Sequence, residues 1–234
     1  MPNPHSLSTR TAVMERLTAD VMRLFLQLPP AAAFPYHAGQ YIDILHQGAA
    51  RSFSLACAPR ADGLLELHIR RIPGNPFTDF IFEDLRVGAQ LVIAGPFGRF
   101  FLQAPGRRRR LFLAGGTGFA PIKSFIETQL HEYPEKEMSL YWGARTTSGL
   151  YLHELACRWQ RERRLHYVPV LSACGVDEEW SGRTGLVHEA LLADWPDLNA
   201  CEIYASGPPP MIDAARAACI GHGLPGEHFH TERY

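Results

Sequence analysis

The sequence has little of what marks membrane-spanning, secreted or nucleic-acid-binding proteins. Its most apolar stretch near the N-terminus, residues 21–28, contains Arg23 and Gln27 and is far shorter than the roughly 20 residues of a membrane span. The first nine residues have no basic or apolar signal region, which favours a cytoplasmic protein. Lys and Arg number 23 against 24 Asp and Glu, so the surplus of cations that nucleic-acid binding needs is absent.

The cysteines are too scattered for a disulfide framework, a zinc ribbon or an iron–sulfur loop. There are five of them, an odd number, and no two form a Cys-x-x-Cys pair. We therefore expect reduced and mostly buried thiols. His228 and His230 are two residues apart and could lie on one face of a strand. No third ligand has suitable spacing, so we expect no metal site.

What is present falls into two halves with different periodicity. The first hundred residues contain short runs with strand-like alternation, separated by Gly, Pro or Asp-Gly turns, at residues 20–28, 39–45, 51–56, 64–70 and 89–95. Short strands at this spacing predict an antiparallel barrel or sandwich. A short helix is expected within residues 73–85, after a loop rich in Gly and Pro.

The second half alternates strands with helices. Strands are expected at residues 111–114, 138–142, 166–171 and 201–206, each followed by an amphipathic segment. This alternation predicts a parallel sheet covered by helices on both faces. The fold class is therefore two domains: an antiparallel β-barrel over residues 1–104, followed by an α/β domain over residues 111–234, with 105–110 as the linker.

Four consecutive arginines, Arg107–Arg110, lie at this predicted linker. We interpret them as a solvated connection. The alternative is that they dock an acidic electron-transfer partner, because clusters of one charge sign steer association.

The strongest single candidate site is the loop Gly115–Pro121, Gly-Gly-Thr-Gly-Phe-Ala-Pro, between an expected strand and an expected helix. Glycines let a backbone approach a ligand closely, and a helix N-terminus presents free N–H groups to phosphate. The loop departs from the usual dinucleotide fingerprint, because Pro121 replaces the third glycine and the next strand ends in Gly143-Ala144-Arg145 without an acidic residue. It indicates a nucleotide site or, alternatively, only a tight turn.

Two further segments suggest ligand contacts. Ser206–Met211, Ser-Gly-Pro-Pro-Pro-Met, follows the last long strand of the parallel sheet, at the edge where ligands bind in such sheets. In the barrel half, Arg51–Ser54 places Arg51 and Phe53 on one face of a strand and two serines on the other. This pattern indicates a bound polar group or an edge strand with a solvated arginine.

Taken in order, these segments resemble the ferredoxin–NADP reductase superfamily, and in particular bacterial NAD(P)H-flavin reductases and the reductase components of oxygenases. The resemblance extends over most of the chain, through FPYHAGQYIDI (34–44), RSFSLA (51–56), GPFGRFFL (95–102), LAGGTGFAP (113–121), YWGAR (141–145) and YASGPPPM (204–211). It implies an FAD-binding barrel, a nicotinamide-binding α/β domain and hydride transfer from nicotinamide C4 to flavin N5.

The resemblance also implies roles for individual residues in the barrel. Arg51 would contact the flavin phosphates, Phe53 would pack on the isoalloxazine, and Ser54 would hydrogen-bond near N5. His68 and Arg70 would flank the flavin. The loop and helix start that bind the flavin pyrophosphate in the family correspond to Gly74, Asn75, Phe77 and Thr78.

In the second domain, the resemblance implies that the glycine-rich loop binds the nicotinamide cofactor's pyrophosphate, with Thr117 near the nicotinamide. Ser206 stands where the family often has a cysteine close to nicotinamide C4. Arg145 and Tyr151 match the adenosine end, and an aromatic near the C-terminus, Tyr234 or its rival Phe229, would cover the flavin. The remaining implied cofactor contacts are Gly115, Gly116, Gly118, Pro121, Gly207, Pro208 and Met211. Ser54, Thr117 and Ser206 are the candidate catalytic residues.

Three functions follow as alternatives. The first is an NAD(P)H-dependent flavin reductase that uses FAD, FMN or free flavin. The second is a reductase component with tightly held FAD that passes electrons to a separate ferredoxin, oxygenase or deoxysugar-pathway partner, because no iron–sulfur segment is visible in this sequence. The third is a non-catalytic flavin- or nucleotide-binding module. The choice between NADH and NADPH is open at this point.

Overall fold

A computed structural model describes residues 5–30, 32–103, 106–162, 164–175 and 180–232. The chain divides into two compact units. The first comprises Met1–Leu102 with Lys123–Thr128, and the second comprises Gln103–Ile122 with Gln129–Tyr234. We describe each unit by itself.

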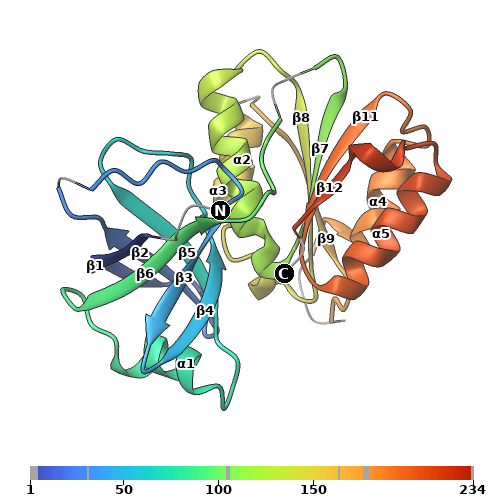
Figure 1. Ribbon diagram of the computed structural model, residues 1–234. Coiled ribbons are helices and arrows are strands. Elements are labelled where there is room, and N and C mark those ends of the chain that lie inside the picture. Colours follow the sequence, from blue (N-terminus) through green and yellow to red (C-terminus); the bar gives the residue numbers. More distant parts are fainter. Residues whose placement is uncertain (1–4, 31, 104–105, 163, 176–179, 233–234) are drawn as a thin grey trace. The chain divides into compact units, whose positions relative to one another are not determined.

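The first unit is built on a six-stranded antiparallel sheet with the order β4-β3-β6-β1-β2-β5 (Figure 1). Its strands are β1 (His5–Arg16), β2 (Val21–Gln27), β3 (Tyr41–His46), β4 (Ala49–Ser54), β5 (Leu64–Arg70) and β6 (Gln90–Phe97). A bridge between Leu55, directly after β4, and Leu67, in the middle of β5, connects the two edge strands and so curls the sheet toward a closed barrel. Helix α1 (Pro76–Asp79) and a π-helical turn (Phe80–Asp84) interrupt the strands where a short helix was predicted.

Period-two alternation explains the core of this unit. In β5, Leu65, Leu67 and Ile69 are buried with an exposed fraction of at most 1%, and they face inward with Leu24 and Leu26 of β2. Strand β1 was not predicted, because its sequence alternates small polar residues with few large apolar ones.

The second unit is a six-stranded parallel sheet with the order β10-β9-β8-β7-β11-β12. Its strands are β7 (Arg109–Gly115), β8 (Met138–Ala144), β9 (His166–Leu171), β10 (Arg183–Thr184), β11 (Cys201–Ser206) and β12 (Phe229–Thr231). Helices α2 (Phe119–Glu132) and α3 (His153–Arg161) lie on one face, and α4 (Val187–Asp194) and α5 (Pro209–Gly221) on the other (Figure 1). The predicted fold class, an antiparallel barrel followed by a parallel α/β sheet, is confirmed.

The arginine run differs from its prediction as a solvated connection. Arg109 and Arg110 are the first residues of β7, and Arg110 is buried with 2% exposure because it pairs with Glu202 of β11 at 2.7 Å. Arg108 donates to the carbonyl oxygen of Asn199, whereas Arg107 is exposed. A run of four charges therefore hides one residue that belongs to the interior, and linear sequence does not distinguish it from its neighbours.

All five cysteines carry free thiols, and Cys57, Cys201 and Cys219 are buried. Within the described part of the chain, no helix combines the length and the apolar character needed to cross a bilayer.

A buried ionic cluster lies on the outer face of β5, within the first unit. Residues 123–128, the middle of α2, belong to this unit and cover that face. The Lys123 ammonium donates to the carbonyl oxygen of Ala56 at 2.9 Å, to Glu66 Oε2 at 2.9 Å and to Glu127 Oε1 at 2.6 Å. All three donor positions of a lysine buried to 1% exposure are thus occupied.

Glu66 is the centre of this cluster. Burial alone would raise the pKa of its carboxyl group, but the hydrogen bond from His68 at 2.9 Å and the charges of Lys123 and Arg23 lower that pKa to about 2. Burial lowers the pKa of His68, so its ring is neutral at pH 7. Because an ionised carboxylate only accepts, Nε2 of His68 carries the hydrogen.

We predict that Glu66→Gln lowers the free energy of unfolding by about 3 kcal/mol at pH 7, the equivalent of the lowered pKa. The charged carboxylate stabilises the folded chain above its ordinary pKa of 4.5, and this contribution is lost as the pH falls toward 2. Urea unfolding at several pH values measures the difference, which should shrink below pH 4.5. Glu83→Gln, in an exposed ion pair with Arg71, is the control and should cost less than about 1 kcal/mol. A pH-independent difference for Glu66→Gln would contradict this account.

Candidate functional site

The two predicted loops of the second unit meet at the carboxyl edge of its sheet. Strands β7 and β11 pair in parallel with Ala114 opposite Ser206, so Gly115–Gly118 and Ser206–Met211 leave the sheet side by side. A Cβ atom on Gly118 would lie 2.2 Å from the carbonyl oxygen of Ser206 and 2.6 Å from the nitrogen of Gly207. The two loops therefore touch backbone to backbone, which only glycine allows at residue 118.

Met211, in the first turn of α5, fills the remaining space between the loops. A Cβ on Gly115 would lie 2.5 Å from its Sδ, and a Cβ on Gly207 would lie 2.7 Å from its Cε. Pro208 and the prolines after it set the start of α5. Gly115, Gly118, Gly207 and Met211 thus form one packed group, although they were predicted from two separate motifs.

An aromatic group supports the glycine-rich loop from below. The Trp142 indole N–H donates to the carbonyl oxygen of Gly116 at 3.0 Å, which holds Gly116 at a φ of +52°. Phe119 stacks on Trp142 with ring centroids 3.8 Å apart, and Tyr151 meets Trp142 edge-on at 5.2 Å. Trp142 and Phe119 were not among the predicted site residues. In the sequence, Trp142 lies within the YWGAR segment and Phe119 directly follows Gly118, so their places in these two motifs could have marked both as site residues.

The other predicted residues of this unit surround the two loops. Thr117 is half-buried, Ser206 is 7% exposed and Pro121 is buried in the first turn of α2. Tyr151 is 9% exposed, so most of its ring packs inside the aromatic group. Arg145 is exposed just beyond β8, where its carbonyl oxygen accepts from the amide of Ala173 at 2.9 Å.

In the first unit, the predicted flavin residues of β4 lie at the end of that strand. Phe53 packs against the barrel core, with its ring 6.0 Å from Phe77 of α1. Ser54 is half-buried. The Arg51 side chain is exposed, and its Nη1 donates only to the neighbouring carbonyl oxygen of Ala50 at 3.1 Å. Its guanidinium thus lies at the surface.

The side chains of His68 and Arg70, both on β5, differ in their burial and in their hydrogen bonds. The imidazole of His68 is fully buried against Glu66, under residues 123–128. The buried Nε atom of Arg70 has no hydrogen-bond acceptor, because its nearest carboxylate oxygen, on Asp20, is 3.6 Å away. Arg70 is therefore the polar group on β5 with unused donor capacity.

The loop before α1 is organised by Asn75. Gly74 is exposed with a φ of +76°, and no atom lies within 4 Å of the place of a Cβ. The Asn75 side chain caps α1 by accepting from the amides of Phe77 at 3.1 Å and Thr78 at 3.2 Å. The Thr78 hydroxyl donates to the carbonyl oxygen of Ile72 at 3.1 Å. The amides of Phe77 and Thr78 are thus engaged by Asn75 within the loop.

The two candidate terminal aromatics are placed differently. Phe229 is the first residue of β12 and is 4% exposed in the core of the second unit, with the Arg216 guanidinium 5.8 Å from its ring. Its burial favours a packing role over one against a cofactor. Tyr234 lies outside the described residues.

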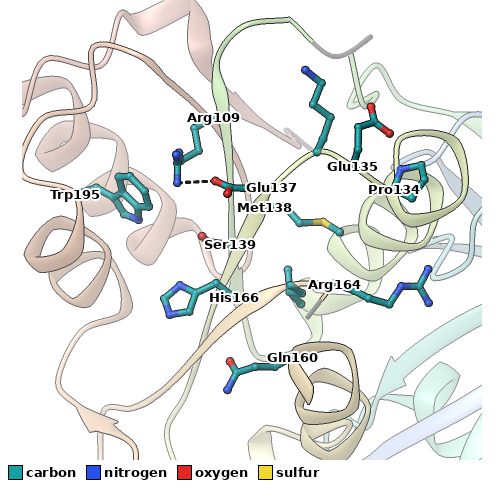
Figure 2. A pocket seen from close by; sticks show the side chains of 12 residues that line it. Arg109, Pro134, Glu135, Glu137, Met138, Ser139, Gln160, Arg164, His166 and Trp195 are labelled. Carbon is teal, nitrogen blue, oxygen red and sulfur yellow. Dashed lines mark ion pairs between the residues drawn. The ribbon is translucent and has the colours of Figure 1, made fainter. Parts of the chain in front are cut away.

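A cavity of about 450 Å³ lies at the opposite, amino-terminal edge of the parallel sheet. Figure 2 shows Arg109 paired with Glu137, at 3.1 Å, beside the Trp195 ring, whose centroid is 4.7 Å from the guanidinium. Arg164, also in its lining, pairs with Glu162 at 3.6 Å. The guanidinium groups of Arg109 and Arg164 in this lining are thus engaged with neighbouring carboxylates.

Two protein families match the chain. Residues 9–102 match the family described as "Oxidoreductase FAD-binding domain", and residues 112–217 match "Oxidoreductase NAD-binding domain". These spans correspond to the antiparallel and the parallel sheets.

Similar proteins are named as reductases. The chain is 40% identical over 222 residues to "CDP-6-deoxy-L-threo-D-glycero-4-hexulose-3-dehydrase reductase" of Yersinia pestis, covering 94% of this chain and 66% of that protein. It is 36% identical over 223 residues to "Phenol hydroxylase P5 protein" of Acinetobacter pittii, covering 93% and 62%. The chain thus spans somewhat less than two thirds of the length of the curated relatives it matches.

Solved structures agree with this. The Amycolatopsis cytochrome P450 reductase GcoB superposes with a TM-score of 0.89 at 30% identity, over 98% of this chain and 70% of that one. The ferredoxin reductase of a carbazole 1,9a-dioxygenase superposes with a TM-score of 0.88 at 27% identity, over 98% and 69%.

We predict that Gly118→Ala weakens the binding of NADH at least tenfold, because a Cβ there must displace the Ser206–Gly207 backbone. Calorimetric titration with NADH measures the affinity. Gly221→Ala is the matched control, since no atom lies within 4 Å of its Cβ position. Equal affinities for the two variants would show that the close approach of the loops does not shape a nucleotide site.

Proposed function

Because this chain belongs to the FAD- and NAD-binding oxidoreductases of the ferredoxin–NADP reductase superfamily, as its ordered motifs predicted, we propose that it transfers electrons from NADH or NADPH to a flavin held by its first unit. The observation that carries the proposal is the backbone contact of Gly118 with Ser206 and Gly207, which joins two loops into one site at the carboxyl edge of a parallel sheet.

The residues of the first unit fit FAD. The Nε of Arg70, which has no hydrogen bond and only a 3.6 Å ion pair with Asp20, and the exposed guanidinium of Arg51 are donors suited to phosphate. Gly74 leaves open space on the loop before α1. Phe53 offers an aromatic face that is already fixed by Phe77. FAD held by these residues would supply the redox chemistry, as the acceptor of a hydride from the nicotinamide.

The residues of the chain position the two cofactors and provide hydrogen bonds to the groups that become charged. The loop Gly115–Gly118 binds the dinucleotide pyrophosphate through its backbone, and the Trp142 hydrogen bond holds that loop rigid before the ligand arrives. Thr117 and Ser206 orient the nicotinamide with their hydroxyl groups. Ser54 donates a hydrogen bond near flavin N5, where negative charge builds up during reduction. Only such positioned donors are needed, because the cofactors are themselves reactive.

The test of this function is an anaerobic titration of the FAD-loaded protein with NADH and with NADPH, followed by absorbance. Loss of the oxidised flavin band in proportion to added nicotinamide supports the proposal. A flavin that binds but keeps its absorbance under excess nicotinamide would favour the alternative of a non-catalytic flavin-binding module.

We further propose that the electrons leave to a separate protein, a ferredoxin, an oxygenase component or a deoxysugar-pathway enzyme. The support is that relatives over most of this chain are named as reductases or electron-transfer components of such systems. A flavin reductase that releases reduced FAD or FMN is the second candidate. A yellow protein after purification with slow turnover of added flavin favours the first, and a colourless protein with fast turnover favours the second. A cytoplasmic location is proposed as well, in keeping with five free thiols.

We predict that Ser54→Ala slows flavin reduction at least tenfold without changing the half-saturating NADH concentration, because one donor to the developing charge is lost. Stopped-flow absorbance separates the limiting rate from saturation. Ser52→Ala, two residues earlier on the same strand, is the control, since that hydroxyl donates to Asp43 at 2.6 Å. An unchanged limiting rate in Ser54→Ala would remove Ser54 from the site.

Arg145 provides a test of cofactor choice. We predict that Arg145→Ala raises KM for NADPH about tenfold more than KM for NADH, because an exposed guanidinium beyond β8 can pair with the 2′-phosphate that only NADPH carries. Steady-state kinetics with both cofactors measures this, with the exposed Arg161→Ala as control. Equal effects on both cofactors would refute a phosphate contact.

A further inference from the structure

The second unit begins at Gln103, and side chains of that unit hold both polar backbone atoms of this residue. The Gln103 amide donates to the Tyr204 hydroxyl oxygen at 3.1 Å, and its carbonyl oxygen accepts from Nη2 of Arg110. Glu202 in turn pairs with Arg110. We call Arg110, Glu202 and Tyr204 the Gln103 clamp.

The clamp is itself fixed in place. Nε of Arg110 donates to Glu202 Oε1 at 2.7 Å, and Nη1 donates to Gln129 Oε1 at 2.9 Å. The Arg110 guanidinium thus reaches three acceptors through three different nitrogens, whereas an ammonium group has a single nitrogen. The Tyr204 hydroxyl faces Glu202 Oε2 at 3.5 Å, and its ring stacks on His230 with centroids 4.6 Å apart. Arg110 and Glu202 are 2% and 7% exposed, and Tyr204 is fully buried.

A buried ion pair of this kind is weak as a source of stability. Desolvation of both charges offsets much of their attraction, and apolar residues of similar volume often replace such pairs without loss. The pair instead fixes the orientation of the Arg110 guanidinium, which binds the backbone carbonyl oxygen of Gln103. The chain just after it is tied down as well, since the Arg109 amide donates to the carbonyl oxygen of Ala200 at 2.9 Å.

We propose that Arg110, Glu202 and Tyr204 are positioning residues for electron transfer, which rests on the function proposed above. By holding Gln103, they fix the first of the points at which the chain passes between the FAD-binding unit and the NAD-binding unit. Loosening that point lowers the rate of the one step that needs both cofactors. It leaves the affinity for each cofactor unchanged, because none of the three residues belongs to the glycine loops or to the β4 segment.

Tyr204→Phe tests the clamp directly, because it removes only the oxygen that accepts from Gln103. Amide hydrogen exchange of Gln103, read by NMR, should become about three- to tenfold faster, the effect of one lost hydrogen bond. Tyr167→Phe is the matched control: a buried tyrosine of the same unit, whose hydroxyl pairs with His153 at 3.0 Å. Unchanged Gln103 exchange in Tyr204→Phe would overturn the clamp.

The kinetic arm tests the positioning role. In single-turnover reduction of bound FAD by NADH, Tyr204→Phe should lower the limiting rate about three- to tenfold. Half-saturating NADH and FAD content should stay at the wild-type values. Arg110→Lys, which keeps the charge beside Glu202 but cannot reach all three acceptors, should behave alike.

Faster Gln103 exchange with an unchanged limiting rate would overturn the positioning role. A rise in half-saturating NADH would do the same, because it would place Tyr204 in nucleotide binding. If the wild-type protein does not reduce flavin at all, the proposed function fails and the positioning role falls with it. The exchange data then still decide whether the clamp holds Gln103.

Discussion

The contact of Gly118 with the Ser206–Gly207 backbone is the constraint on which the candidate site depends. It exists because β7 and β11 are neighbours in a parallel sheet, so two loops that are almost ninety residues apart in sequence leave the same edge in register. A side chain at residue 118 would separate them. Met211 fills the space between the two loops, and the Trp142 indole holds Gly116 by a hydrogen bond. These contacts fix the loop that we propose to bind a pyrophosphate.

Both units place a charged group in the interior to fix a geometry. Lys123 and Glu66 hold the middle of α2 on β5, and Arg110 and Glu202 hold Gln103 on β7 and β11. Lys123 has an acceptor for each of its three donors, and each of the three guanidinium nitrogens of Arg110 has an acceptor among carboxylate, amide and carbonyl oxygens. Such pairing is the condition under which buried charges are tolerated. These pairs locate particular segments, whereas the apolar cores of the two sheets supply the bulk of the stability.

Those features of the fold that depend on local sequence patterns could be predicted from the sequence. Alternation gave the strands of the barrel half, and strand–helix order gave the parallel sheet. The loops rich in glycine and proline were recognised because few other residues can adopt the backbone conformations that such loops require. Contacts between residues that are far apart in the sequence could not be predicted. In sequence, Arg110 does not differ from the three arginines before it, and only its pairing with Glu202 shows that it is buried. The burial of His68 likewise depends on residues 123–128, which are far from it in sequence. The core position of Phe229 and the capping of the Phe77 and Thr78 amides by Asn75 are also contacts that the sequence alone does not reveal. Roles that depend on a bound flavin or nicotinamide stay predictions.

The most direct test of the central claim, that the chain positions a nicotinamide for hydride transfer to flavin, is the isotope effect on flavin reduction. FAD-loaded protein is mixed without oxygen with NADH or with NADH deuterated at both C4 positions, and the loss of flavin absorbance is followed in a single turnover. The account predicts that reduction occurs and that deuterium slows the limiting rate, because the C4–H bond breaks in that step. Nicotinamide binding with no reduction of the flavin, or reduction at a rate that deuterium leaves unchanged at every concentration of NADH, would contradict it.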